Sequence, residues 1–133
     1  MGTMGSSTLK PEEKIRQSVI AFLEKLGFPS SYIIQEKALS ELPHLSGEAH
    51  LPLRRVDILA YGLIHEALKP LLLIECKAES VGQEAFSQLL GYNHFVKAPF
   101  IALASKSGFL LFNCKTKTWL NHCESYTHLC LQA

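Results

Sequence analysis

Residues 70–77 read Pro-Leu-Leu-Leu-Ile-Glu-Cys-Lys, an apolar run that ends in an acid and a lysine. The run is far shorter than the roughly 18 residues of a membrane span, and it has the length of a strand buried at the centre of a sheet. Because side chains alternate along a strand, Glu75 and Lys77 point to one face, roughly 7 Å apart, whereas Cys76 should face the core as a reduced thiol. The alternative is that Glu75 and Lys77 form a solvated pair at the sheet edge that contributes little.

A neighbouring strand is predicted over residues 53–61, where Asp57 interrupts an otherwise apolar pattern. An acid between buried neighbours is costly unless it is paired or binds a metal. Asp57 can therefore be the partner of Arg54 or Arg55, or it can be a metal ligand beside Glu75.

The rest of the chain supplies helices and further strands around these two. Pro11 suits the first position of a helix, apolar residues then recur at helical spacing, and Gly27 suits its end. The pattern predicts helices at 11–26 and 82–95, strands at 32–39, 53–61, 70–76, 100–104 and 109–113, a loop at 41–52, a connection at 62–69, and a tail from Trp119 that is a strand or a short helix. The order is α-β-β-β-α-β, followed by one more strand. It favours an α/β fold with a mixed central sheet flanked by helices.

The whole chain has the size of one domain. Of its 133 residues, 10–133 are expected to form a single domain, with 1–9 as a disordered N-terminus or a tag remnant. No apolar secretory segment is visible, and the four cysteines form no C-x-x-C pair. These features favour reduced thiols in a cytoplasmic protein with no membrane partner.

The charge and the motifs limit the functions that are possible. The formal net charge is +1, whereas a protein that holds long nucleic acid by charge alone is usually far more basic. Affinity for DNA would then depend on a local patch or on partners. The chain has no G-x-x-x-x-G-K-[ST] loop, and so shows no sign of an ATP-driven motor.

Two carboxylates on adjacent strands beside a lysine meet the needs of phosphodiester hydrolysis. Asp57 and Glu75 supply the hard oxygens that Mg²⁺ prefers, and the ion polarises a phosphoryl oxygen and lowers the pKa of bound water. Lys77 can orient that water or stabilise charge on the phosphate.

Five short stretches carry a family resemblance. They are Pro-Glu-Glu-Lys-Ile-Arg-Gln at 11–17, Leu-Gly-Phe-Pro at 26–29, Arg-Val-Asp-Ile at 55–58, Ile-Glu-Cys-Lys-Ala at 74–78 and Gln-Leu-Leu-Gly-Tyr at 88–92. In this order they resemble the N-terminal nuclease domain of type I restriction enzyme R subunits, within the PD-(D/E)xK superfamily. The last stretch resembles the Q-x-x-x-Y element of RecB-like members.

The resemblance implies a restriction-endonuclease-like core, Mg²⁺ with Mn²⁺ as a substitute, and DNA cleavage. Asp57 and Glu75 become the metal carboxylates, and Lys77 the catalytic lysine. The sequence departs from the family at Val56, where proline is usual, and in lacking a helicase motor. The implied partners are therefore DNA and either a separate motor or specificity subunit or further copies of the chain.

Three more residues are candidates for a supporting role. At 100° per residue, Glu12 falls within the apolar stripe of the first helix, which suits a further metal or water ligand. The alternative is an acid that the helix dipole favours in the first turn. Gln88 and Tyr92 are four residues apart and share a helix face, which can overlook the site or form a simple surface pair.

Other features carry less weight. The cluster of His122, Cys123, His128 and Cys130 has no recognised zinc spacing. The runner-up function is a non-catalytic module that keeps the nuclease fold and binds nucleic acid or another protein.

Overall fold

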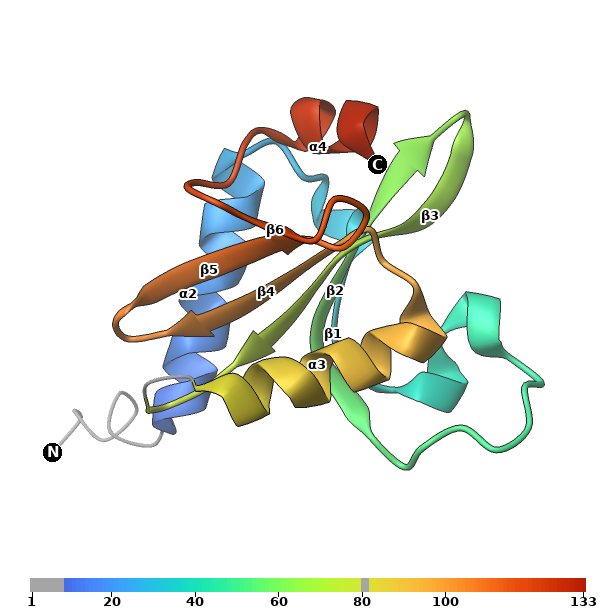
Figure 1. Ribbon diagram of the computed structural model, residues 1–133, viewed down its shortest axis with the longest axis horizontal. Helices are drawn as coiled ribbons and strands as arrows, with labels where there is room; N and C mark the ends of the chain where they lie inside the picture. The colour runs from blue at the N-terminus through green and yellow to red at the C-terminus, as the bar shows by residue number, and fades with distance from the viewer. Residues whose placement is uncertain (1–8, 80–81) are drawn as a thin grey trace, which may run out of the picture.

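A computed structural model of the protein describes residues 9–79 and 82–133 (Figure 1). The expectation of disorder or a tag remnant at 1–9 falls, except for Leu9, outside these residues. In chain order the elements are α2 (Pro11–Lys25), η1 (Ser30–Tyr32), β1 (Ile33–Ala38), η2 (Leu39–Glu41), η3 (Pro43–Leu45), β2 (Arg55–Ile64), β3 (Ala67–Cys76), α3 (Gln83–Val96), β4 (Phe100–Ser105), β5 (Gly108–Asn113), β6 (Thr118–Leu120) and α4 (Tyr126–Gln132).

The first helix forms as the pattern predicts. Pro11 occupies its first turn, and Ile15, Val19 and Leu23 are its buried residues, spaced four apart along one side. Beyond the helix Gly27 has a φ of 99°, a conformation that glycine adopts without a side-chain clash. None of the helices within the described ranges is long and apolar enough to cross a membrane.

The strands form one mixed sheet in the order β1-β2-β3-β4-β5-β6. Neighbouring strands are antiparallel except β3 and β4, which run parallel. A parallel pair needs a crossover, and α3 supplies it. The prediction of a mixed α/β sheet flanked by helices is confirmed.

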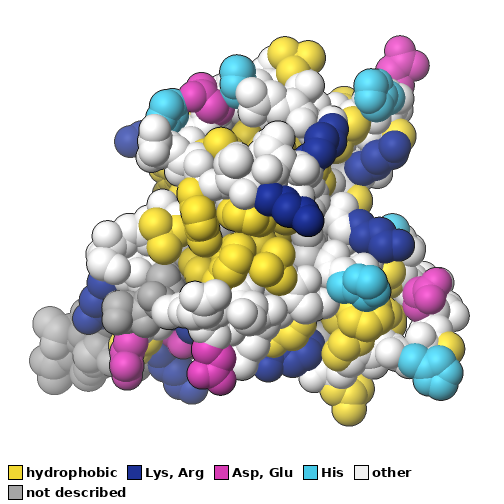
Figure 2. Space-filling model, viewed as in Figure 1, with side chains coloured by type: hydrophobic (Ala, Val, Ile, Leu, Met, Phe, Trp, Pro, Cys, Tyr) yellow, Lys and Arg dark blue, Asp and Glu magenta, His cyan; other side chains and the backbone are white. Residues whose placement is uncertain are grey.

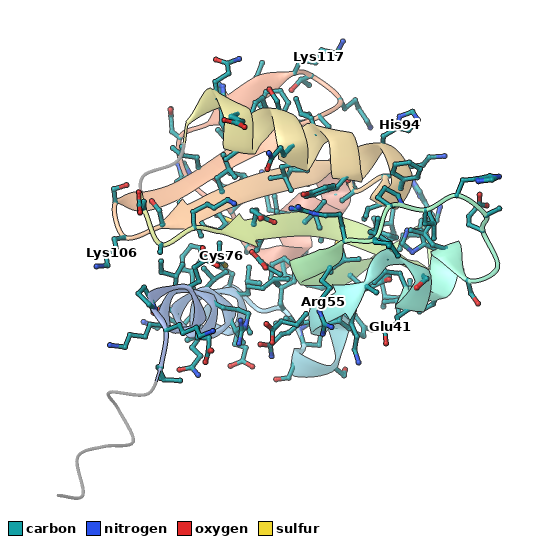
Figure 3. All side chains as sticks on the ribbon, turned by 90° about the horizontal axis from the view of Figure 1, so that it is seen from below. Glu41, Arg55, Cys76, His94, Lys106 and Lys117 are labelled. Atoms are coloured by element: carbon teal, nitrogen blue, oxygen red, sulfur yellow. The ribbon has the colours of Figure 1, made fainter. Side chains whose placement is uncertain are left out.

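Helices cover both faces of this sheet. Figure 3 shows the sheet from its edge, with α2 on one side and α3 on the other. The α2 face also receives Leu129 of α4, and the α3 face receives Leu39, Leu42 and Leu45 from the short helices before β2. Central strands are therefore buried on both faces, which explains the continuous apolar run in β3.

Two stretches differ from the sequence prediction. The predicted connection at 62–69 is mostly strand, because β2 and β3 extend to a tight hairpin at His65 and Glu66, whose φ angles are 52° and 67°. The hairpin lacks the usual Asn-Gly turn signal, and its leucines Leu63 and Leu68 are about half exposed. The sequence therefore showed neither a turn motif nor the polar outer face that marks the end of a hairpin. In the tail, Thr118–Leu120 is a strand and Tyr126–Gln132 a helix, so both alternatives occur in succession.

Candidate active site

The predicted acids lie on adjacent strands at one end of the sheet. Ile58 of β2 pairs with Ile74 of β3 in the antiparallel ladder, and extending this register by one residue sets Asp57 across from Glu75. Lys77 follows β3 directly, and its backbone N–H donates to the carbonyl of Ala104 on β4 at 2.8 Å. The two carboxylates and the lysine therefore come together where β2 begins and β3 ends.

A backbone hydrogen bond holds the carboxylate of Asp57. Its Oδ2 accepts from the N–H of Cys76 at 2.7 Å, which orients the side chain toward the end of β3. The alternative partners are engaged elsewhere: Arg55 donates to the carbonyl of Glu36, and Arg54 lies over an aromatic ring. Within residues 9–79 and 82–133, Asp57 forms no ion pair with either arginine.

Glu75 and Lys77 form an ion pair that is partly removed from solvent. The Nζ of Lys77 lies 3.5 Å from Oε2 of Glu75, and the two side chains are 33% and 13% exposed, respectively. The interpretation of a fully solvated edge pair does not fit this burial. Electrostatic interactions are stronger here than at an open surface, because less water screens them.

Burial and like charge raise the pKa of both acids. For Asp57, burial is the main cause; the hydrogen bond from Cys76 lowers the pKa again, and the charge of Glu12 raises it. For Glu75, burial comes first, the charge of Asp57 raises the pKa further, and Lys77 lowers it. Two half-buried carboxylates whose ionised forms are disfavoured, that of Glu75 partly by the charge of Asp57, suit a cation between them, and a hard oxygen pair matches the chemistry of Mg²⁺.

The thiol between them is not available as a nucleophile. Burial, and next the charges of Asp57 and Glu75, raise the pKa of Cys76 to about 12. Cys76 is 2% exposed and belongs to the core on the α2 face, and Figure 3 shows it between β3 and α2. It is therefore a protonated, buried thiol, as its position in the strand predicts.

The carboxylate pair is the candidate ligand set for a metal. Over the described ranges, no three or more His, Cys, Asp or Glu side chains gather in a group that could hold an ion. Mg²⁺ commonly keeps several waters and takes one or two protein carboxylates, so Asp57 and Glu75 suffice in number.

A hollow of about 500 Å³ opens beside Lys77, and two of the three supporting candidates line it. Its lining includes Glu12 of α2, Lys77 at the end of β3 and Gln88 of α3. Glu12 is exposed, however, and does not lie in the buried stripe of α2 as its helical angle suggested. The stripe is buried from Ile15 onward, and the first turn borders the open hollow instead of the core.

The third supporting candidate, Tyr92, packs against Arg54. It is absent from the lining of the hollow, and the guanidinium of Arg54 lies 4.3 Å above its ring centroid. The charge of Arg54 also lowers the pKa of Glu75, which places that charge near the site. The sequence alone presents Arg54 only as a possible partner of Asp57, because its stacking on Tyr92 depends on where α3 packs on the sheet.

The fold and the placed side chains define a class: a mixed α/β domain whose central strands present two acids and a lysine at their ends. Residues 11–123 match the family model described as Type I restriction enzyme R protein N terminus. The chain therefore belongs to the family of R-protein N-terminal domains of type I restriction enzymes.

A solved structure has a similar fold. It is the fragment structure of a putative HsdR subunit of a type I restriction enzyme from Vibrio vulnificus YJ016, with a TM-score of 0.60 and 20% sequence identity. The match covers 91% of this chain and 24% of that one, so this chain spans about a quarter of its length. No curated protein matches the sequence.

Proposed function

We propose that this domain is a metal-dependent DNA endonuclease that hydrolyses phosphodiester bonds. One observation carries the proposal: two half-buried carboxylates meet across adjacent strands, with the ammonium of Lys77 3.5 Å from one of them. Membership of a restriction-enzyme family supports DNA as the substrate.

Each residue has a distinct task in this proposal. Asp57 and Glu75 hold Mg²⁺, or Mn²⁺ in its place, and the bond from Cys76 N–H keeps Asp57 oriented for that task. When bound, the ion supplies Lewis-acid polarisation of the phosphate and a more acidic water. Lys77 orients the attacking water or stabilises the charge that develops on the phosphate. Gln88 and Glu12 border the hollow beside Lys77, whose lining also includes the acids Glu79 and Glu84.

The partners and location follow from the family and the charge. A near-neutral domain neutralises few phosphates, so its own affinity for DNA should be weak and should fade as salt rises. We therefore propose that a motor or specificity subunit, or further copies of the chain, deliver DNA to it in the cytoplasm.

The test compares cleavage and metal binding in matched variants. Wild-type protein with Mg²⁺ or Mn²⁺ should nick plasmid DNA slowly, and Lys77→Ala should abolish nicking while calorimetry still detects metal binding. Asp57→Ala should lose both. Lys25→Ala, which removes an exposed cation in the last turn of α2, is the control and should behave as wild type.

A second candidate is a non-catalytic module that binds nucleic acid or protein and keeps the fold. The net charge of +1 favours it, because little of the surface is biased toward a polyanion. If the wild-type protein binds no divalent ion at millimolar concentration and cuts no DNA, this second function replaces the first.

A further inference from the structure

Three aromatic rings form a cluster on the α3 side of the sheet. Phe86 of α3 lies 4.7 Å from Trp119 of β6 and 5.0 Å from Phe112 of β5, measured between ring centroids, and Phe112 lies 5.0 Å from Trp119. Phe112 is buried, whereas Trp119 is 49% exposed. We call these three residues the aromatic platform. Its outer ring presents an indole surface to solvent.

The platform is open because helix α3 covers only part of its face. Within the described ranges, α3 packs mainly on β3 and β4, which leaves much of β5 and β6 uncovered by it. Leu110 of β5 and Leu90 of α3 add further exposed apolar surface beside the rings. Figure 2 shows apolar side chains gathered over this part of the sheet.

The β5–β6 hairpin next to the platform carries charge of one sign, whereas α3 has an acid, Glu84, in its first turn. Lys115 and Lys117 lie in the turn between β5 and β6, and both are exposed. The stretch 108–120, which forms both strands and the turn, contains these two lysines and no acid. Lys and Arg side chains border the apolar patch in Figure 2. Aromatic surface flanked by cations suits the stacked bases and phosphates of a single strand.

The platform also adjoins the candidate active site. Ala85 and Gln88 line the hollow that contains Lys77, and Phe86 belongs to the same turn of α3. Successive helical residues rise about 1.5 Å, so a strand that leaves the hollow meets the platform within a few nucleotides.

We propose that the aromatic platform binds single-stranded DNA, with one or two bases stacked on Trp119 and Phe86 and the backbone held by Lys115 and Lys117. The inference rests on the proposed function in taking DNA as the polymer. A frayed or unpaired segment next to the cut site is the substrate feature it recognises.

Charge complementarity favours this occupant over an apolar protein surface. A second copy of the chain would bring the same two lysines toward an equivalent turn if the interface were symmetric, and like charges there oppose association. A polyanion with flat apolar bases satisfies both the rings and the lysines.

The experiment uses the intrinsic fluorescence of Trp119, which is the only tryptophan in the chain. A thymidine oligonucleotide titrated into the protein in EDTA should quench this emission, and labelled-oligonucleotide anisotropy should report the same affinity. Trp119→Ala should weaken binding about tenfold, and Trp119→Phe, which keeps a ring, by less. Lys115→Ala with Lys117→Ala should reduce the salt slope by roughly 1.4, or about 0.7 for each phosphate that is no longer neutralised.

Matched controls lie away from the platform. Leu68→Ala removes from the β2–β3 hairpin a leucine that is about as exposed as Trp119, and Lys25→Ala removes a cation from α2. Both variants should bind the oligonucleotide as wild type does. The lysine variants are on the surface, so they keep the test valid if Trp119→Ala unfolds.

Two results would refute DNA binding at the aromatic platform. One is an emission spectrum that DNA leaves unchanged; the other is an emission shift that depends on protein concentration alone, which would assign the surface to a second copy. Because the assay contains EDTA, it is independent of cleavage. A protein that binds the oligonucleotide but cuts nothing with Mg²⁺ refutes the nuclease proposal alone, and one that cuts without quenching refutes the platform alone.

Discussion

Replacing Asp57 in two ways separates its hydrogen bond from its charge. Asp57→Ala removes the acceptor of the Cys76 N–H, whereas Asp57→Asn keeps a side-chain oxygen at the same place and removes only the charge. Cys76 is 2% exposed, so its orphaned N–H has little access to water. An unsatisfied buried donor costs about 1–3 kcal/mol.

The charge acts in the opposite direction. Burial and the charge of Glu12 raise the pKa of Asp57, so the ionised carboxylate is disfavoured in the folded protein. Asp57→Asn should therefore be at least as stable as wild type without metal. The two variants should differ by about 1–3 kcal/mol, or roughly 3–12 °C in melting temperature for a domain of this size.

The assay is thermal unfolding followed by circular dichroism, first in EDTA and then with Mg²⁺. Under the proposed function, wild type gains about 1.4 kcal/mol at ten times its Kd for Mg²⁺, and neither variant gains. Glu48→Gln, in the exposed loop before β2, is the control and should keep the response. Equal melting temperatures for Asp57→Ala and Asp57→Asn in EDTA would refute the role assigned to the hydrogen bond.

Two further predictions concern pH and packing. Because the folded pKa of Asp57 is raised above 3.8, its contribution to stability is complete below that value and is lost as pH rises through the folded pKa. The advantage of Asp57→Asn in urea denaturation without metal should therefore grow from about pH 4 to pH 7, and a constant gap would contradict the assigned burial. A Cβ on Gly62 would lie 2.8 Å from Cδ2 of Leu71 and 2.9 Å from Sγ of Cys130, so Gly62→Ala should cost about 1–3 kcal/mol. Gly91→Ala, in α3 with nothing within 4 Å, should instead stabilise by about 0.5–1 kcal/mol, and equal urea midpoints for the two would contradict the close packing of Leu71 and Cys130 around Gly62.

Local patterns were enough for most of the elements. The helix that Pro11 opens, the buried strand at 70–76 and the strand around Asp57 follow from short-range rules of capping, periodicity and alternation, and the structure has all three. Alternation also predicted that Glu75 and Lys77 share a face and that Cys76 faces the core, and their ion pair and its burial agree. The hairpin at His65 was missed because neither its turn residues nor its exposed leucines carry the usual signal.

The tertiary structure alone decided how these pieces meet. The hydrogen bond from Cys76 N–H to Asp57 joins residues 19 apart in the sequence, and Arg54 contacts Tyr92 although β2 and β3 separate them along the chain. No local pattern therefore contains either contact. Glu12 illustrates the limit of helical periodicity as a predictor of burial. Its angle around the helix axis is a local property, but its exposure depends on which turns of α2 lie against the sheet. Periodicity determines which way a side chain points along its own element. Register, crossover and helix placement determine what it meets, because those depend on burial summed over the whole chain.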